Sequence, residues 1–171
     1  MNIITNNIPL LERPYRSCVG LMVFNKTGNV FCGQRLDNKA EAWQLPQGGI
    51  DKDELPIEAG FRELKEETSI INVEFVSEYP EWLNYEIPLP LADNLWEGKY
   101  RGQTQRWLLF HFVGNDEEID IRTSHPEFKQ WIWLDPKLLP ERAISFKQDV
   151  YRKINKIFIP MIHNFNASNF E

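Results

Sequence analysis

Residues 48–70, GGIDKDELPIEAGFRELKEETSI, form the most strongly patterned stretch of the chain, in which a glycine pair leads into an expected helix. Asp53 or Glu54 can cap this helix, and Pro56 suits a first turn that needs no intrahelical donor. At about 100° per residue, apolar side chains gather on one face, which we expect to pack against a core. This predicted core face consists of Ile57, Phe61, Leu64 and Thr68.

Three glutamates lie together on a different arc of the same helix. Glu63, Glu66 and Glu67 fall within about 100° of one another, and like charges at this spacing repel. Arg62 can reach Glu66 and offset part of the repulsion. Magnesium ions are held by carboxylates and substrate phosphates, so a hard divalent cation is the obvious remaining partner.

The loop before the helix suits such a site, because Gly48 and Gly49 allow backbone groups to approach a ligand closely. A second interpretation is that RELKEE is simply a solvated charged face, which is the commoner origin of such runs. The wider spacing favours the metal site. The spacing of Gly48, Glu54, Arg62, Glu63, Glu66 and Glu67 resembles the signature of the Nudix hydrolases. Ser69 stands where that family normally has a glycine, which often caps a helix in the left-handed conformation.

Length and composition indicate one globular domain. The chain has 171 residues, of which 42% are hydrophobic and 26% charged. We expect a single domain over 1–171 with its core at about 15–160, and loosely ordered ends at 1–14 and 164–171. Cys18 and Cys32 lie in apolar, strand-like surroundings without metal-ligand spacing, so buried thiols are expected.

The net charge of −6 argues against an extended nucleic-acid surface, for which a basic stripe is the usual mark. The same charge is compatible with an enzyme that binds only the phosphorylated end of a nucleic acid. No apolar run is long enough to span a bilayer, and the first residues lack the pattern of a secretion signal. We therefore expect a cytoplasmic protein without membrane partners.

Strands are expected before and after the acidic helix, and a final helix after them. A mixed sheet covered on both faces is the expected α/β fold, and the Nudix resemblance specifies an α/β/α sandwich. The expected strands are 17–25 and 30–35, joined as a hairpin, then 71–78, 105–114 and 130–134. Ser145 opens the final helix with a capping box to Gln148, and Pro160 limits its extent. His111 is expected to be a packed strand residue.

The resemblance extends over most of the chain. YRSCVG, WQLPQGGI, EWLNY, GQTQRW, HPEF and SFKQDVYRKI are similar to segments of the bacterial RNA pyrophosphohydrolase and dinucleoside polyphosphate hydrolase branch of the Nudix hydrolases. The resemblance implies metal binding by the three helix glutamates, by Glu127 of HPEF and by the carbonyl of Gly48. Without the resemblance, Glu127 is an ordinary loop acid.

The same resemblance implies a set of substrate-binding residues. Arg16, Arg35 and Lys147 match positions that grip phosphates or the nucleotide, and Tyr85 and Phe146 match aromatic positions near the base. Aromatic stacking of this kind tolerates any base.

The activity implied is metal-assisted attack of water on a phosphorus of a polyphosphate chain. Glu63 is the preferred proton acceptor, Glu67 is the alternative, and Arg62 completes the catalytic set. Mg²⁺ is the expected cofactor, with Mn²⁺ or another divalent metal also possible.

The expected reaction converts the 5′-triphosphate end of RNA to a monophosphate. A dinucleoside polyphosphate such as diadenosine tetraphosphate is the alternative substrate, and a non-catalytic nucleotide- or RNA-binding module is a remote alternative. The sequence does not give the oligomeric state.

Overall fold

The computed structural model describes residues 8–37 and 40–170. Its centre is a mixed sheet in the order β4-β6-β1-β2-β7, with β3 paired to β1 and β5 paired to β6. Among the strands of the described residues, β1 and β6 are the one parallel pair, and the other pairs are antiparallel. The strands are β1 (Tyr15–Phe24), β2 (Val30–Arg35), β3 (Gln47–Gly49), β4 (Val73–Glu78), β5 (Leu83–Glu86), β6 (Gly102–Phe112) and β7 (Phe128–Leu134).

The central strands are buried on both faces, as parallel pairs usually are. Along β1, Leu21 and Val23 belong to one hydrophobic cluster, whereas Met22 and Phe24 belong to the other. The same alternation holds along β6, which explains why both strands read as nearly continuous apolar runs.

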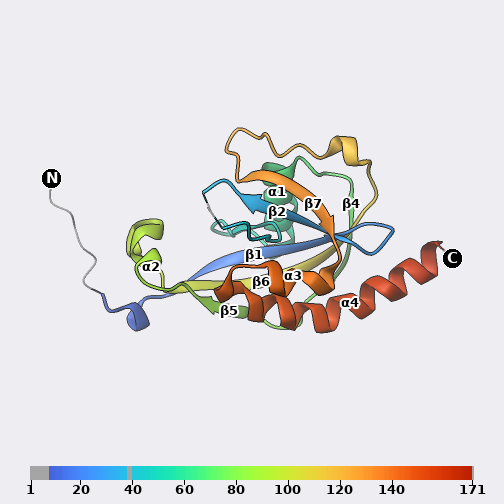
Figure 1. The fold of residues 1–171 in the computed structure, drawn as a ribbon. Helices are drawn as coiled ribbons and strands as arrows, with labels where there is room; N and C mark the ends of the chain where they lie inside the picture. Colours follow the sequence, from blue (N-terminus) through green and yellow to red (C-terminus); the bar gives the residue numbers. More distant parts are fainter. Residues whose placement is uncertain (1–7, 38–39, 171) are drawn as a thin grey trace.

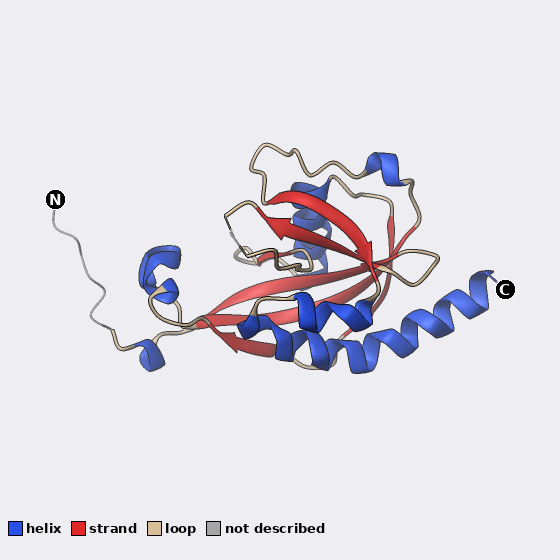
Figure 2. Ribbon diagram, viewed as in Figure 1, coloured by secondary structure: helices blue, strands red, loops and turns tan. Residues whose placement is uncertain are grey.

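Helices cover the two faces, as expected for an α/β/α sandwich (Figure 1). Helix α1 (Pro56–Thr68) packs on one cluster through Ala59 and Leu64. On the other face lie α3 (Leu139–Arg142) and the long α4 (Gln148–Phe170), which appear below the sheet in Figure 2. Among the described residues, no helix is long and apolar enough to cross a membrane.

The predicted hairpin is present but opens from its base. β1 and β2 are paired at Phe24 and Val30, and then diverge. β1 continues against β3, while β2 turns to β7. β3 thereby lies against the first half of β1, with Gly48 opposite Val19 and Gly49 opposite Cys18.

The carboxy-terminal helix corrects two expectations. Residues Ser145–Lys147 form a 3₁₀ turn without a serine cap, and α4 then continues past Pro160 to Phe170, so 164–170 is helical rather than loose. Pro160 is exposed, and water can satisfy the carbonyl that its missing N–H leaves free. Beyond it, Phe165 packs against Phe24 and His111, which holds the end of the helix to the sheet.

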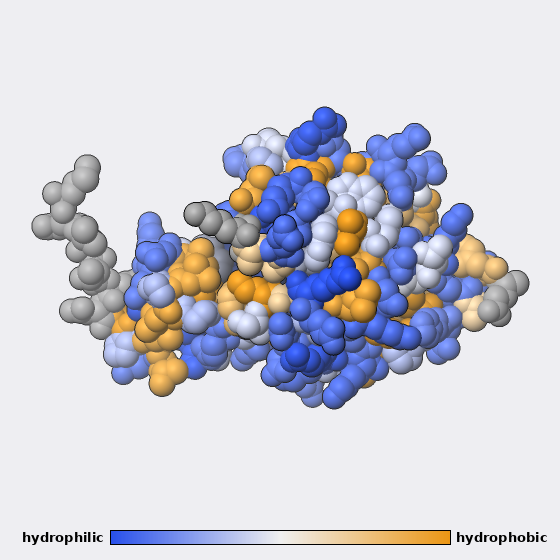
Figure 3. Space-filling model, in the orientation of Figure 1, coloured by the Kyte–Doolittle hydropathy of each residue, from blue (hydrophilic) through white to orange (hydrophobic). Residues whose placement is uncertain are grey.

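Within the residues described, the amino-terminal segment expected to be loosely ordered contains a 3₁₀ turn at Leu10–Glu12. Residues 1–7 lie outside the described residues. Arg13 is buried and pairs with Asp93 of α2 (Leu91–Asn94) at 2.6 Å. Around α2, Leu11, Leu89 and Leu91 are exposed, and Figure 3 shows hydrophobic side chains gathered there.

Candidate active site

The start of α1 differs from the prediction. Leu55, rather than Asp53 or Glu54, is the N-cap residue, and its N–H donates to Glu58 Oε2 at 2.9 Å. Glu54 instead accepts from Asp51 N at 2.8 Å and from Arg62. Arg62 lowers the pKa of Glu54 to about 2, so this carboxylate is fixed in its charged form.

The buried face of α1 is rotated from the predicted one. Leu64 and Thr68 are buried as expected, but Phe61 is 42% exposed and touches Phe110 edge-on. Gly60 lies on the buried face instead of Phe61. A Cβ at Gly60 would lie only 2.7 Å from Leu108, so the helix packs closely at this point. The close approach at this glycine turns Glu67 toward the interior, where it is only 7% exposed.

Arg62 ties the glycine turn to the acidic helix. Its guanidinium donates to the carbonyl of Gly49 at 2.8 Å, to Glu63 Oε1 at 2.8 Å and to Glu66 Oε2 at 3.3 Å. It also donates twice to Glu54. Arg62 therefore offsets part of the repulsion among the glutamates and sets the orientation of two of them.

The four predicted metal-binding carboxylates line one pocket of about 290 Å³, which we call the acid pocket. Three come from α1, and Glu127 comes from the loop before β7. The lining residues are Glu63, Glu66, Glu67, Ser124, His125 and Glu127.

Glu67 is the least compensated member of the acid pocket. Its Oε2 atom is buried and has no hydrogen-bond partner among the described residues. Burial raises its pKa well above the usual value, and the charges of Glu63 and Glu127 raise it further. Burial also raises the pKa of Glu63, although Arg62 opposes that shift.

This arrangement fits a hard divalent cation without being shaped for one in advance. Within the part of the chain that the structure describes, no three acidic, histidine or cysteine side chains are close enough together to hold a metal ion. Glu63 and Glu66 turn to Arg62 instead. The unpartnered oxygen of Glu67 and the surrounding carboxylates nevertheless supply the oxygen ligands that magnesium takes.

Gly48 and Gly49 fit tightly between charged side chains. A Cβ added at Gly48 would overlap the carboxylate of Glu63, and one at Gly49 would overlap the guanidinium of Arg16. The glycines are therefore required by close approach. The Gly48 backbone lies beside Glu63, and its carbonyl stays a predicted fifth ligand.

A second pocket of about 260 Å³ gathers four of the predicted substrate-binding residues, and we call it the nucleotide pocket after their predicted role. They are Arg35, Tyr85, Phe146 and Lys147. The rings of Tyr85 and Phe146 stack with centroids 5.7 Å apart. Tyr85 is buried, so Phe146 is the ring of this pair with an accessible surface and Tyr85 supports it.

Lys147 and Arg35 give this pocket its hydrogen-bond donors. Lys147 is buried, and its Nζ donates to Gln44 Oε1 at 3.0 Å. Burial and the charge of Arg35 lower the pKa of Lys147 to about 7. Arg35 pairs with Asp37 at 2.7 Å and with Glu127 of the acid pocket at 3.6 Å, so it lies between the two pockets.

The fifth predicted substrate residue, Arg16, does not line the nucleotide pocket. Its guanidinium packs 5.0 Å from the ring of Trp96, which does line it, and lies against Gly49. Trp96 was not predicted. The signal was the aromatic-rich stretch 81–107, within which residues 88–102 fold into α2 and a 3₁₀ segment, Leu95–Gly98.

Other residues of the nucleotide pocket were also missed. Gln47 and Gln103 lie on its inner side and are buried, although glutamine is usually exposed. Gln103 belongs to β6 because that strand begins at Gly102, three residues before the predicted start.

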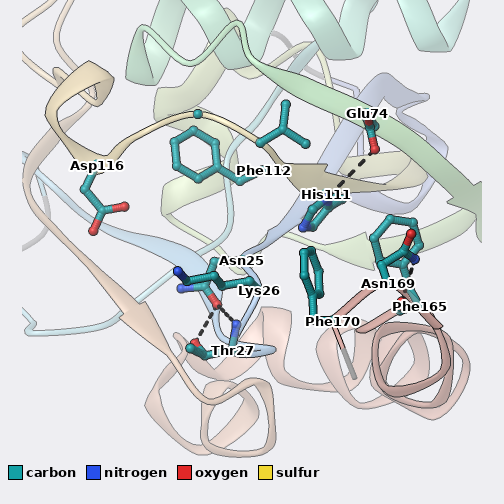
Figure 4. Close-up of a pocket in the computed structure, with 12 residues that line it drawn as sticks. Asn25, Lys26, Thr27, Glu74, His111, Phe112, Asp116, Phe165, Asn169 and Phe170 are labelled. Atoms are coloured by element: carbon teal, nitrogen blue, oxygen red, sulfur yellow. Dashed lines mark hydrogen bonds and ion pairs between the residues drawn. The ribbon is translucent and has the colours of Figure 1, made fainter. Parts of the chain in front are cut away.

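A larger cavity than these two, about 520 Å³, lies between the turn after β1, the end of β6 and the end of α4 (Figure 4). His111 lies there with its Nδ1 atom 3.8 Å from Glu74, and Phe24, Phe165 and Phe170 surround its ring. Its burial confirms the expectation of a packed strand residue. Burial lowers the pKa of His111, which favours the neutral ring.

Comparisons with known proteins identify the family and agree with the fold. The NUDIX domain model matches residues 14–154. "RNA pyrophosphohydrolase" of Roseobacter denitrificans is 51% identical over 140 residues, covering 81% of this chain and 88% of that protein. The protein of the same name from Cereibacter sphaeroides is 46% identical over 152 residues, covering 88% and 94%.

Among solved structures, the E. coli dihydroneopterin triphosphate pyrophosphohydrolase matches with a TM-score of 0.65 at 19% identity, covering 86% of this chain and 99% of that chain. A C. elegans Ap4A hydrolase matches with a TM-score of 0.60 at 22% identity, covering 84% and 97%. At these identities the structural matches establish the fold alone. Together with the sequence matches, they place this chain in the Nudix hydrolase family, in the branch whose curated members are named RNA pyrophosphohydrolase.

Proposed function

We propose that this protein hydrolyses the 5′-triphosphate end of RNA to a 5′-monophosphate, with a divalent metal ion, preferably magnesium, in the acid pocket. The observation that carries the proposal is Arg35, whose guanidinium joins the two pockets. It lines the nucleotide pocket and pairs with Glu127 of the acid pocket at 3.6 Å. A phosphate chain that follows Arg35 would run from a base at Phe146 to the carboxylates. The name shared by relatives at 46–51% identity supports the same substrate.

Enzymes of this family generally use a divalent metal ion. When bound, such an ion polarises phosphate oxygens, lowers the pKa of the attacking water and neutralises the leaving group. Glu63, Glu66, Glu67 and Glu127 would hold it, with the Gly48 carbonyl as a further ligand.

The protein groups have separate roles in the step. The water oxygen bonds to a phosphorus as the P–O bond of the anhydride breaks, and the bridging oxygen leaves with its phosphate. Glu63 accepts the proton of the water, with Glu67 as the alternative. Arg62 orients Glu63 through its 2.8 Å hydrogen bond. Arg16, Arg35 and Lys147 balance the negative charge of the phosphates, and phosphate near Lys147 favours its protonated form.

A dinucleoside polyphosphate is the second candidate substrate. It offers the same two parts, a nucleoside beside a phosphate chain, and the two adjoining pockets accommodate that pattern equally. The acidic net charge favours this smaller substrate over a long RNA. We propose a cytoplasmic, single-domain enzyme in either case.

One competition assay tests the proposal. Purified protein receives 5′-triphosphorylated RNA and diadenosine tetraphosphate together, with magnesium or with a chelator, and both products are followed. We expect magnesium-dependent release of phosphate or pyrophosphate from the RNA, with the higher catalytic efficiency. Preferred cleavage of the dinucleotide would favour the second candidate, and no magnesium-dependent cleavage of either would refute both.

A further inference from the structure

Gln103 of β6 lies between two of the predicted substrate-binding residues. The strand register pairs it with Arg16 of β1 on one side and with Tyr85 of β5 on the other. Paired residues on adjacent strands project from the same face of a sheet. Gln103 is 3% exposed and lines the nucleotide pocket, so its side-chain amide is held at the inner end of that pocket.

Buried hydrogen bonds determine which atom of this amide faces the pocket. They begin at Trp107, whose indole nitrogen can only donate, and it donates to Gln105 at 3.1 Å. The Gln105 atom that accepts must be its oxygen. The Gln105 nitrogen therefore donates at its other contacts, to Gln47 at 3.1 Å and to Gln103 at 2.9 Å.

Gln47, Gln103 and Gln105 form a buried glutamine network. The atoms that accept from Gln105 must be the oxygens of Gln47 and Gln103, so the orientations of these two amides are also determined. The Gln47 nitrogen then donates to the same Gln103 oxygen at 3.3 Å. With its oxygen accepting from two donors, Gln103 cannot be turned over without opposing two N–H groups.

The side-chain nitrogen of Gln103 takes no part in this network. Among the described residues, no group accepts a hydrogen bond from Gln103 Nε2, and the atom is not sealed from solvent. It therefore presents N–H donors to the pocket, and a ligand must supply an acceptor to use them.

We propose that Gln103 is a substrate-binding residue, which donates through Nε2 to an oxygen of the nucleotide held in this pocket. The inference rests on the proposed function, because it assumes that a nucleotide occupies the pocket. A phosphate oxygen and a base or ribose oxygen offer the same acceptor chemistry. Gln47 and Gln105 hold the amide in its donating orientation.

The test is the isosteric substitution Gln103→Glu. One carboxylate oxygen still accepts from Gln47 and Gln105, so the network is kept, while an acceptor replaces the donor that faces the pocket. Gln103→Met removes the donor without adding charge. For both variants we expect KM for triphosphorylated RNA to rise, with kcat within about threefold. The rise should be about tenfold or more if the lost hydrogen bond was to a charged phosphate oxygen, and about fivefold if it was to a neutral base or ribose oxygen.

A matched control is Gln130→Glu, which places the same change on β7 outside the nucleotide pocket and should leave KM unchanged. Inorganic tripolyphosphate as a competitive inhibitor distinguishes the two acceptors. If Gln103 donates to a phosphate oxygen, the inhibition constant of tripolyphosphate rises together with KM in Gln103→Met. If the acceptor is a base or ribose oxygen, the inhibition constant stays at the wild-type value.

An unchanged KM in Gln103→Met would overturn the inference. Weaker binding by Gln103→Glu alone would not rescue it, because the added negative charge would repel the substrate. Should Gln103→Glu fail to fold, Gln103→Met alone decides. Wild-type protein without magnesium-dependent RNA cleavage would instead refute the proposed function, so the two failures are distinguishable.

Discussion

The acid pocket and the nucleotide pocket are built in opposite ways. Most of the acid pocket comes from one helix, and its chemistry is an excess of acceptors that culminates in the unpartnered oxygen of Glu67. The nucleotide pocket draws on several strands and loops distant in sequence, and its chemistry is an excess of donors from Arg35, Lys147 and Gln103. The acid pocket therefore suits cations, and the nucleotide pocket suits anions or carbonyl oxygens. A nucleotide polyphosphate with its metal ion satisfies both.

The comparison predicts separable kinetic effects, of which the largest belongs to the acid pocket. Glu66→Gln neutralises a proposed metal ligand at an exposed position of α1, so it should lower kcat at least 100-fold without affecting folding. Turnover with magnesium and the melting temperature are to be measured together. Glu74→Gln on β4, outside the acid pocket, is the control. Near-normal turnover by folded Glu66→Gln would refute the metal assignment.

The nucleotide pocket should respond in KM instead. Phe146→Ala removes the free ring surface, and stacking on one base contributes about 1–3 kcal/mol. We expect KM for triphosphorylated RNA to rise about tenfold with kcat nearly unchanged. Trp82→Ala truncates another exposed aromatic away from the pocket and should change neither constant. If Phe146→Ala lowers kcat and leaves KM unchanged, the assignment of binding to the nucleotide pocket and of catalysis to the acid pocket is wrong.

A smaller effect should appear in the stability of the metal-free protein. The folded pKa of Glu67 is raised, so its neutral form stabilises the fold at low pH, and this contribution is lost as pH rises from about 4.5 through the folded pKa. Glu67→Gln should therefore melt about 3 °C or more above wild type at pH 8 with chelator. The difference should shrink toward pH 4.5 and with added magnesium. A variant less stable than wild type at pH 8 would contradict the uncompensated charge.

The smallest effect concerns the end of α1, which supports the acid pocket. Ser69 adopts the left-handed conformation (φ 62°) usual for glycine, and its Oγ donates to the carbonyl of Asp120 at 2.8 Å. Ser69→Ala keeps the strain and loses the hydrogen bond, so it should cost about 1 kcal/mol. Ser69→Gly loses the bond but relieves the strain and should be nearly neutral. Chemical denaturation checks both, and equal destabilisation by the two would show that strain is unimportant.

The two pockets also differed in how far the sequence revealed them. Spacing within one helix places Glu63, Glu66 and Glu67 on one arc, so the acidic cluster is readable from local geometry. The strands and the two-sided sheet were equally readable from apolar periodicity. The rotation of α1 was not, because it depends on Gly60 meeting Leu108 across the sandwich.

The nucleotide pocket depended more on resemblance. Arg35, Tyr85 and Phe146 come from separate elements, and only the folded sheet brings them together. Gln103 was missed because its orientation follows from a network that begins at Trp107 on the same strand and crosses to β3. The extension of α4 past Pro160 was likewise decided by packing of Phe165, which outweighs the local preference.

The central claim is that the carboxylates of the acid pocket hold divalent metal against the phosphates of a nucleotide seated at Phe146. A crystal structure with magnesium and a non-hydrolysable triphosphate analogue tests it most directly. We predict at least one ion bound by oxygens of Glu63, Glu66 or Glu67 and by the analogue, with Glu66 released from Arg62. An analogue bound without any ion, with those carboxylates still paired to Arg62 or turned to solvent, would contradict the account.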